Sequence, residues 1–430
     1  MKKLLALILS LVMVASFAAC GGEGGNNAGT ADDFKLGVIL LGDETESYTL
    51  AHIQGLKAAI ENLGLKDEQV MWEYKIPEEG VCYDKAKQLA TKGCDLIISN
   101  SYGHQDYMAQ AAEEYPDVTF ISMTGDYAAI SGLDNFKNAF NRVYESRYVS
   151  GVVAGLKIKE LVDAGTISPE TTPENFKDGK VKVGYVGAFP FAEVKSGYTA
   201  FFLGVISVYP DVTMDVTFTQ SWFDVDKEGA AAEAFVADGC VIIGQHADSQ
   251  GAPKAVQKAL DSGKVCYSVG YNVSMLDVAP KAALTSATNC WDKYYTFAIG
   301  SAMNGEDIPA DWSAGYAEDA VKITDLGESC AEGTAEMVEE VIASLKSGEV
   351  KVFDTSKFTV EGENLTADSE EGKIDLSYMD FSGDTPTVIH EGDTVDAIKT
   401  ENGVTYFDES TFRAAPYFAI DIDGINAITE

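Results

Sequence analysis

Aromatic, acidic and amide side chains follow several short apolar runs of the sequence. Nine of them stand at or near the ends of these runs: Asp43, Glu44, Tyr102, Phe189, Trp222, Gln245, Asp248, Asn272 and Trp291. Rings on either side can sandwich a planar heterocycle, while carboxylate and amide groups can pair with ring N–H groups or hydroxyls. The set therefore predicts a binding site for a flat ligand that is rich in heteroatoms.

Each of these side chains also has a purely structural explanation. The tryptophans could pack in a core, although a buried indole N–H usually needs a partner. The acidic residues could cap helices, because a carboxylate at a helix N-terminus accepts from free N–H groups and is favoured by the helix dipole. For His104 and His246, which fall at similar positions, we expect capping or core roles.

Catalytic and metal chemistry lack their usual residues. The four histidines fall in separate segments without paired spacing, which argues against a zinc hydrolase or a metal receptor. The sequence holds no GxSxG, no HExxH and no P-loop. Six body cysteines contain no CxxC pair, and Cys94 and Cys240 begin strands at corresponding positions, which favours structural roles. We therefore expect no enzyme, no metal and no cofactor.

Composition and charge restrict the class of protein further. The 430 residues are 46% hydrophobic, which is enough apolar material for two cores. Against 31 lysines and arginines stand 68 acidic residues, a net charge of −37 that would repel the phosphates of nucleic acid. We expect a monomer with a small-molecule ligand and no nucleic-acid partner.

Residues 1–20 are typical of an export signal. An apolar stretch over 4–19 follows two lysines and is too short for a spanning helix. Small residues before Cys20 resemble the bacterial lipobox, with Phe17 where leucine is usual, so Cys20 is expected to carry a lipid. The alternative is an ordinary signal peptide with an incidental cysteine. The Gly-rich segment 21–33 would be a flexible tether, which predicts a lipid-anchored protein on the extracytoplasmic face of the cell membrane.

Strand and helix patterns alternate along the chain in two matching sets. Apolar strand candidates lie at 34–41, 94–99 and 118–123, and again at 181–189, 240–245 and 264–270. Corresponding positions are 146 or 147 residues apart, as in Cys94 and Cys240 or Gly37 and Gly184. The pattern predicts two copies of one parallel α/β unit. Ligands of such sheets bind outside the carboxyl ends of the strands, where the nine side chains are expected.

Two similar parallel-sheet lobes on an exported chain resemble the periplasmic-binding proteins, whose lobes close on a ligand by hinge motion. We expect an α/β, type I periplasmic-binding-protein fold with two Rossmann-like lobes joined by a hinge. The N-terminal lobe is expected over 34–145 plus about 285–310. The C-terminal lobe is expected over 146–284 plus about 311–430, including a C-terminal extension.

Four longer phrases carry a more specific resemblance. They are NRVYESRYVSGVVAG (141–155), GYVGAFPFAEVKSGYTAFFLG (184–204), WFDVDKEGAAAEAFVADGCVIIGQHADS (222–249) and GYNVSMLDVAPKAALTSATNCWDKYY (270–295). Together they resemble the basic membrane protein (Bmp) family of ABC-transporter substrate-binding lipoproteins. Their closest likeness is to the purine and nucleoside branch. The resemblance implies capture of a purine base or nucleoside between the lobes and its delivery to an ABC permease with a separate ATPase subunit.

Two departures from that branch affect the expected ligand. Related receptors often have a tryptophan or Ser-Phe-Asn after the first strand, where this chain has GDETESY, so Tyr48 is expected to supply the ring. Nucleoside receptors have an aspartate in place of Asn272 and a lysine where Asn289 or Trp291 stands. These changes favour a free base, or a nucleoside held mainly by stacking. Riboflavin, a sugar or a signalling molecule remain alternative ligands, and a membrane kinase an alternative partner.

Overall fold

The structure is a computed structural model that describes residues 33–380 and 387–428. The expected signal peptide, the lipidation site Cys20 and nearly all of the expected tether lie outside the described residues. Within the described ranges, every helix is too short or too polar to cross a membrane. The six body cysteines are free thiols in the structure.

The first lobe is built on a parallel six-stranded sheet in the order β12-β5-β4-β3-β1-β2. Its strands are β1 (Leu36–Ile39), β2 (Val70–Glu73), β3 (Leu96–Ser99), β4 (Thr119–Met123), β5 (Phe136–Ala139) and β12 (Asp311–Trp312). The helices of this lobe are α1 (Ser47–Leu63), α2 (Val81–Thr91), α3 (Gln105–Glu114) and α8 (Trp291–Asn304), the last packed against α1. Strands β1 and β3 are buried throughout, which explains their unbroken apolar runs.

The second lobe repeats this plan around a sheet in the order β13-β11-β10-β9-β7-β8-β20. Its strands are β6 (Phe176–Lys177), which pairs with β7, then β7 (Lys180–Gly187), β8 (Val212–Phe218), β9 (Ile242–Gln245), β10 (Tyr267–Tyr271), β11 (Ala283–Asn289), β13 (Val321–Ile323) and β20 (Ile425–Ile428). Its helices are α4 (Val143–Asp163), α5 (Ala192–Val208), α6 (Val225–Asp238), α7 (Gly251–Asp261) and α9 (Thr334–Ser347). Short 3-10 helices cover Asp67–Gln69, Tyr102–His104, Pro173–Asn175, Tyr316–Glu318, Thr355–Lys357 and Glu370–Gly372. The predicted doubled α/β fold is confirmed.

Glycines let α4 and α5 approach each other closely. A Cβ atom at Gly151 of α4 would lie 2.0 Å from the carbonyl oxygen of Phe201 on α5, and one at Gly204 of α5 would lie 2.1 Å from the carbonyl oxygen of Tyr148. Since neither site has room for a side chain, α4 is fixed to the second lobe along its length.

Three chain segments connect the lobes. They run from β5 to α4, from β11 to α8 and from β12 toward β13. The first and third lie together, because the Phe140 and Arg142 amides donate to the carbonyls of Trp312 and Ala314 at 2.9 and 2.8 Å. The boundary expected at 284/285 falls within β11, all of which belongs to the second sheet.

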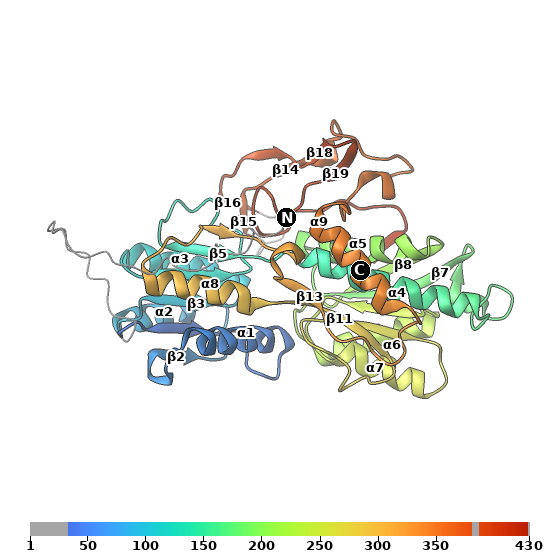
Figure 1. The fold of residues 1–430 in the computed structure, drawn as a ribbon, viewed down its shortest axis with the longest axis horizontal. Helices are drawn as coiled ribbons and strands as arrows, with labels where there is room; N and C mark the ends of the chain where they lie inside the picture. The colour runs from blue at the N-terminus through green and yellow to red at the C-terminus, as the bar shows by residue number, and fades with distance from the viewer. Residues whose placement is uncertain (1–32, 381–386, 429–430) are drawn as a thin grey trace, which may run out of the picture.

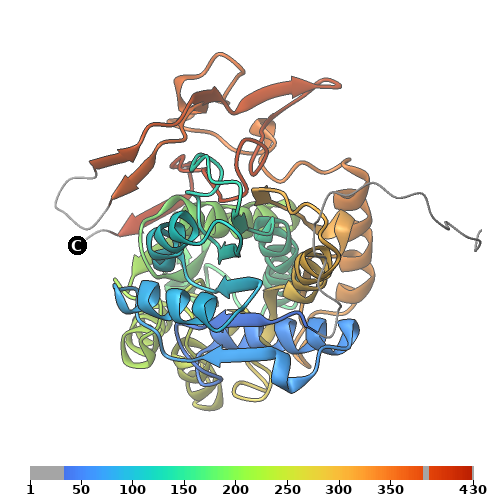
Figure 2. The same ribbon diagram turned by 90° about the vertical axis from the view of Figure 1, so that its left-hand side faces the viewer.

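The C-terminal part of the chain forms an extension that lies outside both large sheets except for its last strand, β20, which joins the edge of the second sheet. It contains three antiparallel pairs, made by β14 (Lys373–Asp375) with β17 (Thr394–Asp396), β15 (Tyr378–Asp380) with β16 (Thr387–His390), and β18 (Ile398–Glu401) with β19 (Val404–Phe407). Figure 1 shows this extension in orange to red along one side of the molecule, with β15 and β16 beside the first lobe. The turned view in Figure 2 shows it on the same side, across from α1 and β2.

Candidate functional site

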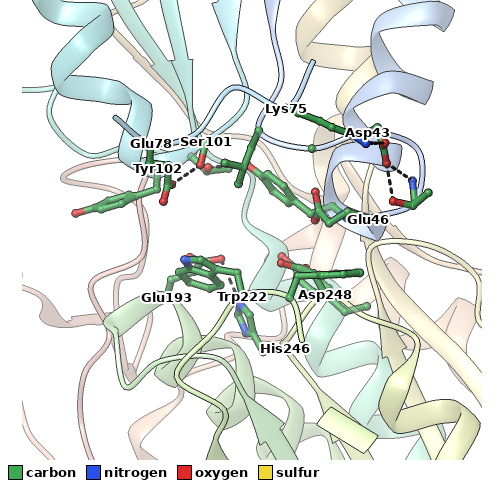
Figure 3. Close-up of a pocket in the computed structure, with 17 residues that line it drawn as sticks. Asp43, Glu46, Lys75, Glu78, Ser101, Tyr102, Glu193, Trp222, His246 and Asp248 are labelled. Carbon is green, nitrogen blue, oxygen red and sulfur yellow. Dashed lines mark hydrogen bonds and ion pairs between the residues drawn. The ribbon is translucent and has the colours of Figure 1, made fainter. Parts of the chain in front are cut away.

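A cavity of about 280 Å³ lies between the lobes, at the carboxyl ends of their strands. Figure 3 shows the residues of the first lobe on one side, with Glu46 among them, and Trp222 and Asp248 of the second lobe opposite. Both lobes line it, the first with Leu41, Gly42, Asp43, Thr45, Glu46, Tyr48, Lys75, Glu78, Ser101, Tyr102 and Thr124, and the second with Glu193, Trp222, Phe223, His246, Asp248 and Tyr271.

Tyr48 supplies an aromatic ring from the first turn of α1. Its hydroxyl donates to the carbonyl of Asn100 and exchanges a hydrogen bond of 2.8 Å with Thr124 Oγ1. Burial raises the pKa of Tyr48 well above its usual value, so the phenol stays neutral. The Tyr48 ring packs edge-on against His52 with ring centres 4.5 Å apart, and the His52 ring stacks on Trp291 with ring centres 4.7 Å apart. Trp291 is therefore buried behind Tyr48 and does not line the cavity.

Glu46 both caps α1 and faces the cavity. Its two carboxylate oxygens accept from the amides of Tyr48 and Thr49, each at 3.1 Å. Asp43 lies beside it and pairs with Lys75 at 2.6 Å, which holds the pKa of Asp43 below its usual range. Glu44 is exposed and lies outside the lining.

Glu78 fixes the loop that carries Tyr102. Its carboxylate accepts from Ser101 Oγ at 2.5 Å and from the amide of Gly103 at 2.9 Å. His104, directly after this loop, is buried with its Nε2 atom 2.9 Å from the carbonyl of Ile76. The His104 ring is thus part of the support of the loop, and Tyr102 is the ring that reaches the cavity.

Trp222 is the half-buried ring of the second lobe, on the connection after β8. Phe189 packs edge-on behind it at a centroid distance of 5.2 Å and stacks on Phe191 at 5.1 Å. The carbonyl of Trp222 accepts from the amide of Asp248 at 2.7 Å, which ties the loops after β8 and β9 together. Phe189 supports Trp222 and lies outside the cavity lining.

Asp248 is a buried carboxyl group of the second lobe that lines the cavity. Its Oδ1 atom accepts from Asn272 Nδ2 at 2.6 Å, so the Asn272 amide is directed to Asp248 and lies outside the cavity lining. Burial raises the pKa of Asp248, and the nearby Glu46 carboxylate adds to this effect. The Gln245 side chain donates to the carbonyls of Ala247 and Ser249 at 2.7 and 3.0 Å, which shapes the loop from within.

A buried arginine holds the floor of the second-lobe side. The Arg147 guanidinium lies 3.6 Å from the ring centre of Tyr271 and donates to Tyr185 Oη at 2.7 Å and to the carbonyl of Gln245 at 2.6 Å. Beside it, His246 Nε2 lies 3.2 Å from Glu193 Oε1. Burial, together with the positive Arg147, lowers the pKa of His246 to about 4, so this ring is neutral at physiological pH.

The structure divides the residues expected from sequence into two groups. The cavity is lined by Asp43, Tyr48, Tyr102, Trp222 and Asp248, whereas Glu44, Phe189, Gln245, Asn272 and Trp291 lie elsewhere.

Sequence patterns do not single out the carboxylates Glu46, Glu78 and Glu193, although all three line the cavity. Glu46 and Glu193 stand where helices begin, and Glu78 follows β2, whose sequence VMWE is too short and polar to mark a strand. An acidic residue at the start of a helix that follows a strand end is the signal that would have found two of the three.

The cavity combines aromatic faces with hydrogen-bonding carboxyl groups on both lobes. Its one lysine is already paired with Asp43, so an anionic ligand would meet several acidic groups without a free cation among the lining residues. The described residues contain no group of three or more side chains arranged to hold a metal ion. The site therefore suits a neutral or cationic ligand with flat or apolar faces and N–H or O–H donors.

Comparison with known proteins agrees with this architecture. A purine-binding protein of Brucella abortus is 31% identical over 330 residues, covering 76% of this chain and 85% of that protein. A protein of Haloferax volcanii, named as a candidate glucose-binding protein of an ABC transporter, is 30% identical over 323 residues, with coverages of 74% and 72%. The structure of an ABC-transporter solute-binding protein from Aeropyrum pernix superposes with a TM-score of 0.61 at 18% identity, covering 77% and 94% of the two chains.

The same assignment follows from a family model. The model described as the PnrA-like ABC transporter substrate-binding protein (Bmp) matches residues 46–356, which include both lobes and all cavity-lining segments except the first few residues after β1. The fold, the two-lobe cavity and this match agree with the expected resemblance. The chain belongs to the Bmp family of extracytoplasmic ABC-transporter substrate-binding proteins, which bind a small molecule for a permease and are not enzymes.

Proposed function

We propose that this receptor captures a purine base or nucleoside between its lobes and delivers it to an ABC permease. The observation that carries the proposal is the cavity itself, where Tyr48 and Trp222 offer ring faces and Glu46 and Asp248 offer carboxyl groups from opposite lobes. A purine has two apolar faces and a rim of ring nitrogens, which fits such a lining. The purine-binding relative in Brucella abortus supports the same ligand class.

Within that class, the free base fits the geometry better than the nucleoside. The Asn272 amide is directed to Asp248 at 2.6 Å, so it adds no contact for a ribose. Each lobe supplies rings and carboxyl groups, which is enough to hold a base by stacking and by its N–H groups. In this proposal the protein acts as a monomer, anchored by a lipid on Cys20 at the extracytoplasmic face of the membrane.

A sugar is the second candidate. Aromatic rings also pack on the apolar faces of sugars, carboxylates accept from their hydroxyls, and the Haloferax volcanii relative is named for glucose.

Thermal unfolding of the protein with a panel of ligands tests the proposal. The panel contains adenine, guanine, hypoxanthine, their nucleosides, riboflavin and glucose, with AMP as the anionic control. A ligand at one hundred times its dissociation constant adds about 2.7 kcal/mol to the free energy of unfolding. We expect stabilisation by at least one purine base and none by AMP. Stabilisation by glucose or riboflavin alone would keep the receptor and replace the ligand.

A further inference from the structure

The C-terminal extension is firmly attached to the second lobe. Its last strand, β20, pairs in parallel with β8 over four residue pairs. Phe418 stacks on Phe353 with ring centres 4.3 Å apart and meets Phe407 at 4.9 Å, and all three belong to the second-lobe core. An ion pair of 2.7 Å between Asp421 and Lys195 of α5 adds a contact at the surface.

The same extension also inserts a tyrosine into the first lobe. Tyr378 of β15 is 5% exposed and belongs to a core cluster whose other buried members all come from the first lobe. Its hydroxyl donates to Asp106 Oδ2 at 3.0 Å, and its ring stacks on Tyr127 at 5.0 Å. His390 of β16 stacks on Tyr127 as well, at 4.4 Å.

A second contact joins the segment after β19 to the first lobe. Arg413 Nη1 lies 3.7 Å from Asp126 Oδ2, and both side chains are largely buried, at 12% and 13% exposure. The next amide, of Ala414, donates to Asp311 Oδ2 at 2.6 Å, while Asp311 Oδ1 accepts from Asn138 Nδ2 at 2.7 Å. The extension therefore contacts β12 and the loop after β4.

Both contacts fall next to residues that line the ligand cavity. Asp106 lies four positions after Tyr102, and Asp126 two positions after Thr124. Gln105 links the two segments, since its Oε1 atom accepts from the amides of Asp126 and Tyr127, each at 3.0 Å. The extension therefore contacts the same two chain segments that carry Tyr102 and Thr124 into the cavity lining.

We propose that the extension, residues 357–380 and 387–428, is a strap that ties the two lobes together and positions the Tyr102 and Thr124 wall of the ligand site. The family model matches residues 46–356, so the strap lies outside the matched part of the chain. Lobe opening must separate its anchors on β8 from Tyr378 and Arg413. The strap therefore limits opening, and Tyr378 and Arg413 are positioning residues for ligand binding.

Measurements on the ligand-free protein test whether the strap limits lobe opening. Their result does not depend on which ligand the receptor takes. The variant Tyr378→Phe with Arg413→Gln removes a charge-assisted hydrogen bond and an ion pair while keeping the stacked ring. We expect a larger radius of gyration by small-angle X-ray scattering and about tenfold faster amide exchange at 102–106 and 124–127. The matched control Asp421→Asn removes a strap contact within the second lobe only, and both readings should stay at their wild-type values.

Whether the strap positions the ligand site is tested by binding of hypoxanthine, or of whichever panel member stabilises the wild type. We expect the double variant to bind it several-fold more weakly, with Asp421→Asn unchanged. Wild-type scattering and wild-type exchange in a folded double variant would overturn the strap, whatever the affinity. If the double variant does not fold, Tyr378→Phe alone carries the same two readings, because it deletes only one hydroxyl. Faster amide exchange with unchanged affinity would overturn the positioning role of the strap, while its role in limiting lobe opening would stand.

Discussion

The two lobes contribute differently to the same cavity. On the first-lobe side, most polar groups already have protein partners, since Asp43 pairs with Lys75 and Glu78 holds the Tyr102 loop. On the second-lobe side, Trp222 is half-buried against two phenylalanines, and Asp248 is buried with a single amide partner. The first-lobe side is thus held partly by an ion pair at the surface, and the second-lobe side by buried contacts that include Arg147 beneath Tyr271. The two lobes therefore hold their cavity-lining groups in place by different kinds of contact.

The largest expected effect comes from Arg147, the buried arginine beneath the second-lobe side of the cavity. Arg147→Lys keeps the charge but cannot both stack on Tyr271 and reach Tyr185 and the Gln245 carbonyl. We expect the free energy of unfolding to fall by about 3 kcal/mol, measured by urea denaturation. The control is Arg142→Lys, which alters the partly exposed ion pairs of Arg142 with Glu145 and Glu318 and should cost less than about 1 kcal/mol. Equal losses would show that Arg147 contributes no more to stability than a partly exposed arginine, which would contradict its role beneath the second-lobe side.

A pH-dependent effect of intermediate size is expected at Glu228, which accepts from the amide of Ser249 behind the second-lobe wall. Burial raises the pKa of Glu228 to about 7 from 4.5. Between these values the folded protein keeps a proton that the unfolded chain releases, so the free energy of unfolding falls as pH rises.

Glu228→Gln removes this titration, so stability should decline less from pH 4.5 to 7, by about 2 kcal/mol in total. The pKa of His246 is lowered to about 4, so its titration makes the free energy of unfolding rise with pH. This contribution is the same in the variant and the wild type and cancels when the two are compared. Parallel stability curves for the variant and the wild type, from urea denaturation at each pH, would contradict the raised pKa.

The smallest effect concerns binding and compares the two walls directly. Trp222→Ala should weaken binding of the stabilising purine by at least about 1 kcal/mol, measured by calorimetry, because a stacked base face is lost. Tyr48→Phe keeps its ring and removes only the hydroxyl that contacts Asn100 and Thr124, so its affinity should change less. Unchanged affinity in a folded Trp222→Ala protein would remove this ring from the site.

Sequence patterns were sufficient for the lobes because their central strands are buried and therefore read as unbroken apolar runs. They were less sufficient for the site, since a position after a strand does not determine where the side chain points. Asn272 and Trp291 both follow strands, yet Asn272 has a positive φ of 63° and bonds to Asp248, while Trp291 opens α8 and turns behind His52. Glu46 was missed because its position at the start of α1 is already explained by capping, so the sequence carries no separate sign that it lines the cavity. The contacts of the extension with Asp106 and Asp126 join residues more than 250 positions apart, which no local pattern encodes.

The close contact of α4 with α5 has a practical consequence for sensor engineering. With Gly151 and Gly204 leaving no space for a methyl group, α4 moves as one piece with its lobe, and only residues 140–142 separate it from β5. This joint is three residues long. A rotation about it displaces the far ends of the lobes more than the residues beside the joint. A pair of dyes placed near the C-terminal ends of α2 and α6, away from the cavity-lining Glu78 and Phe223, would therefore report ligand capture as a change in energy transfer.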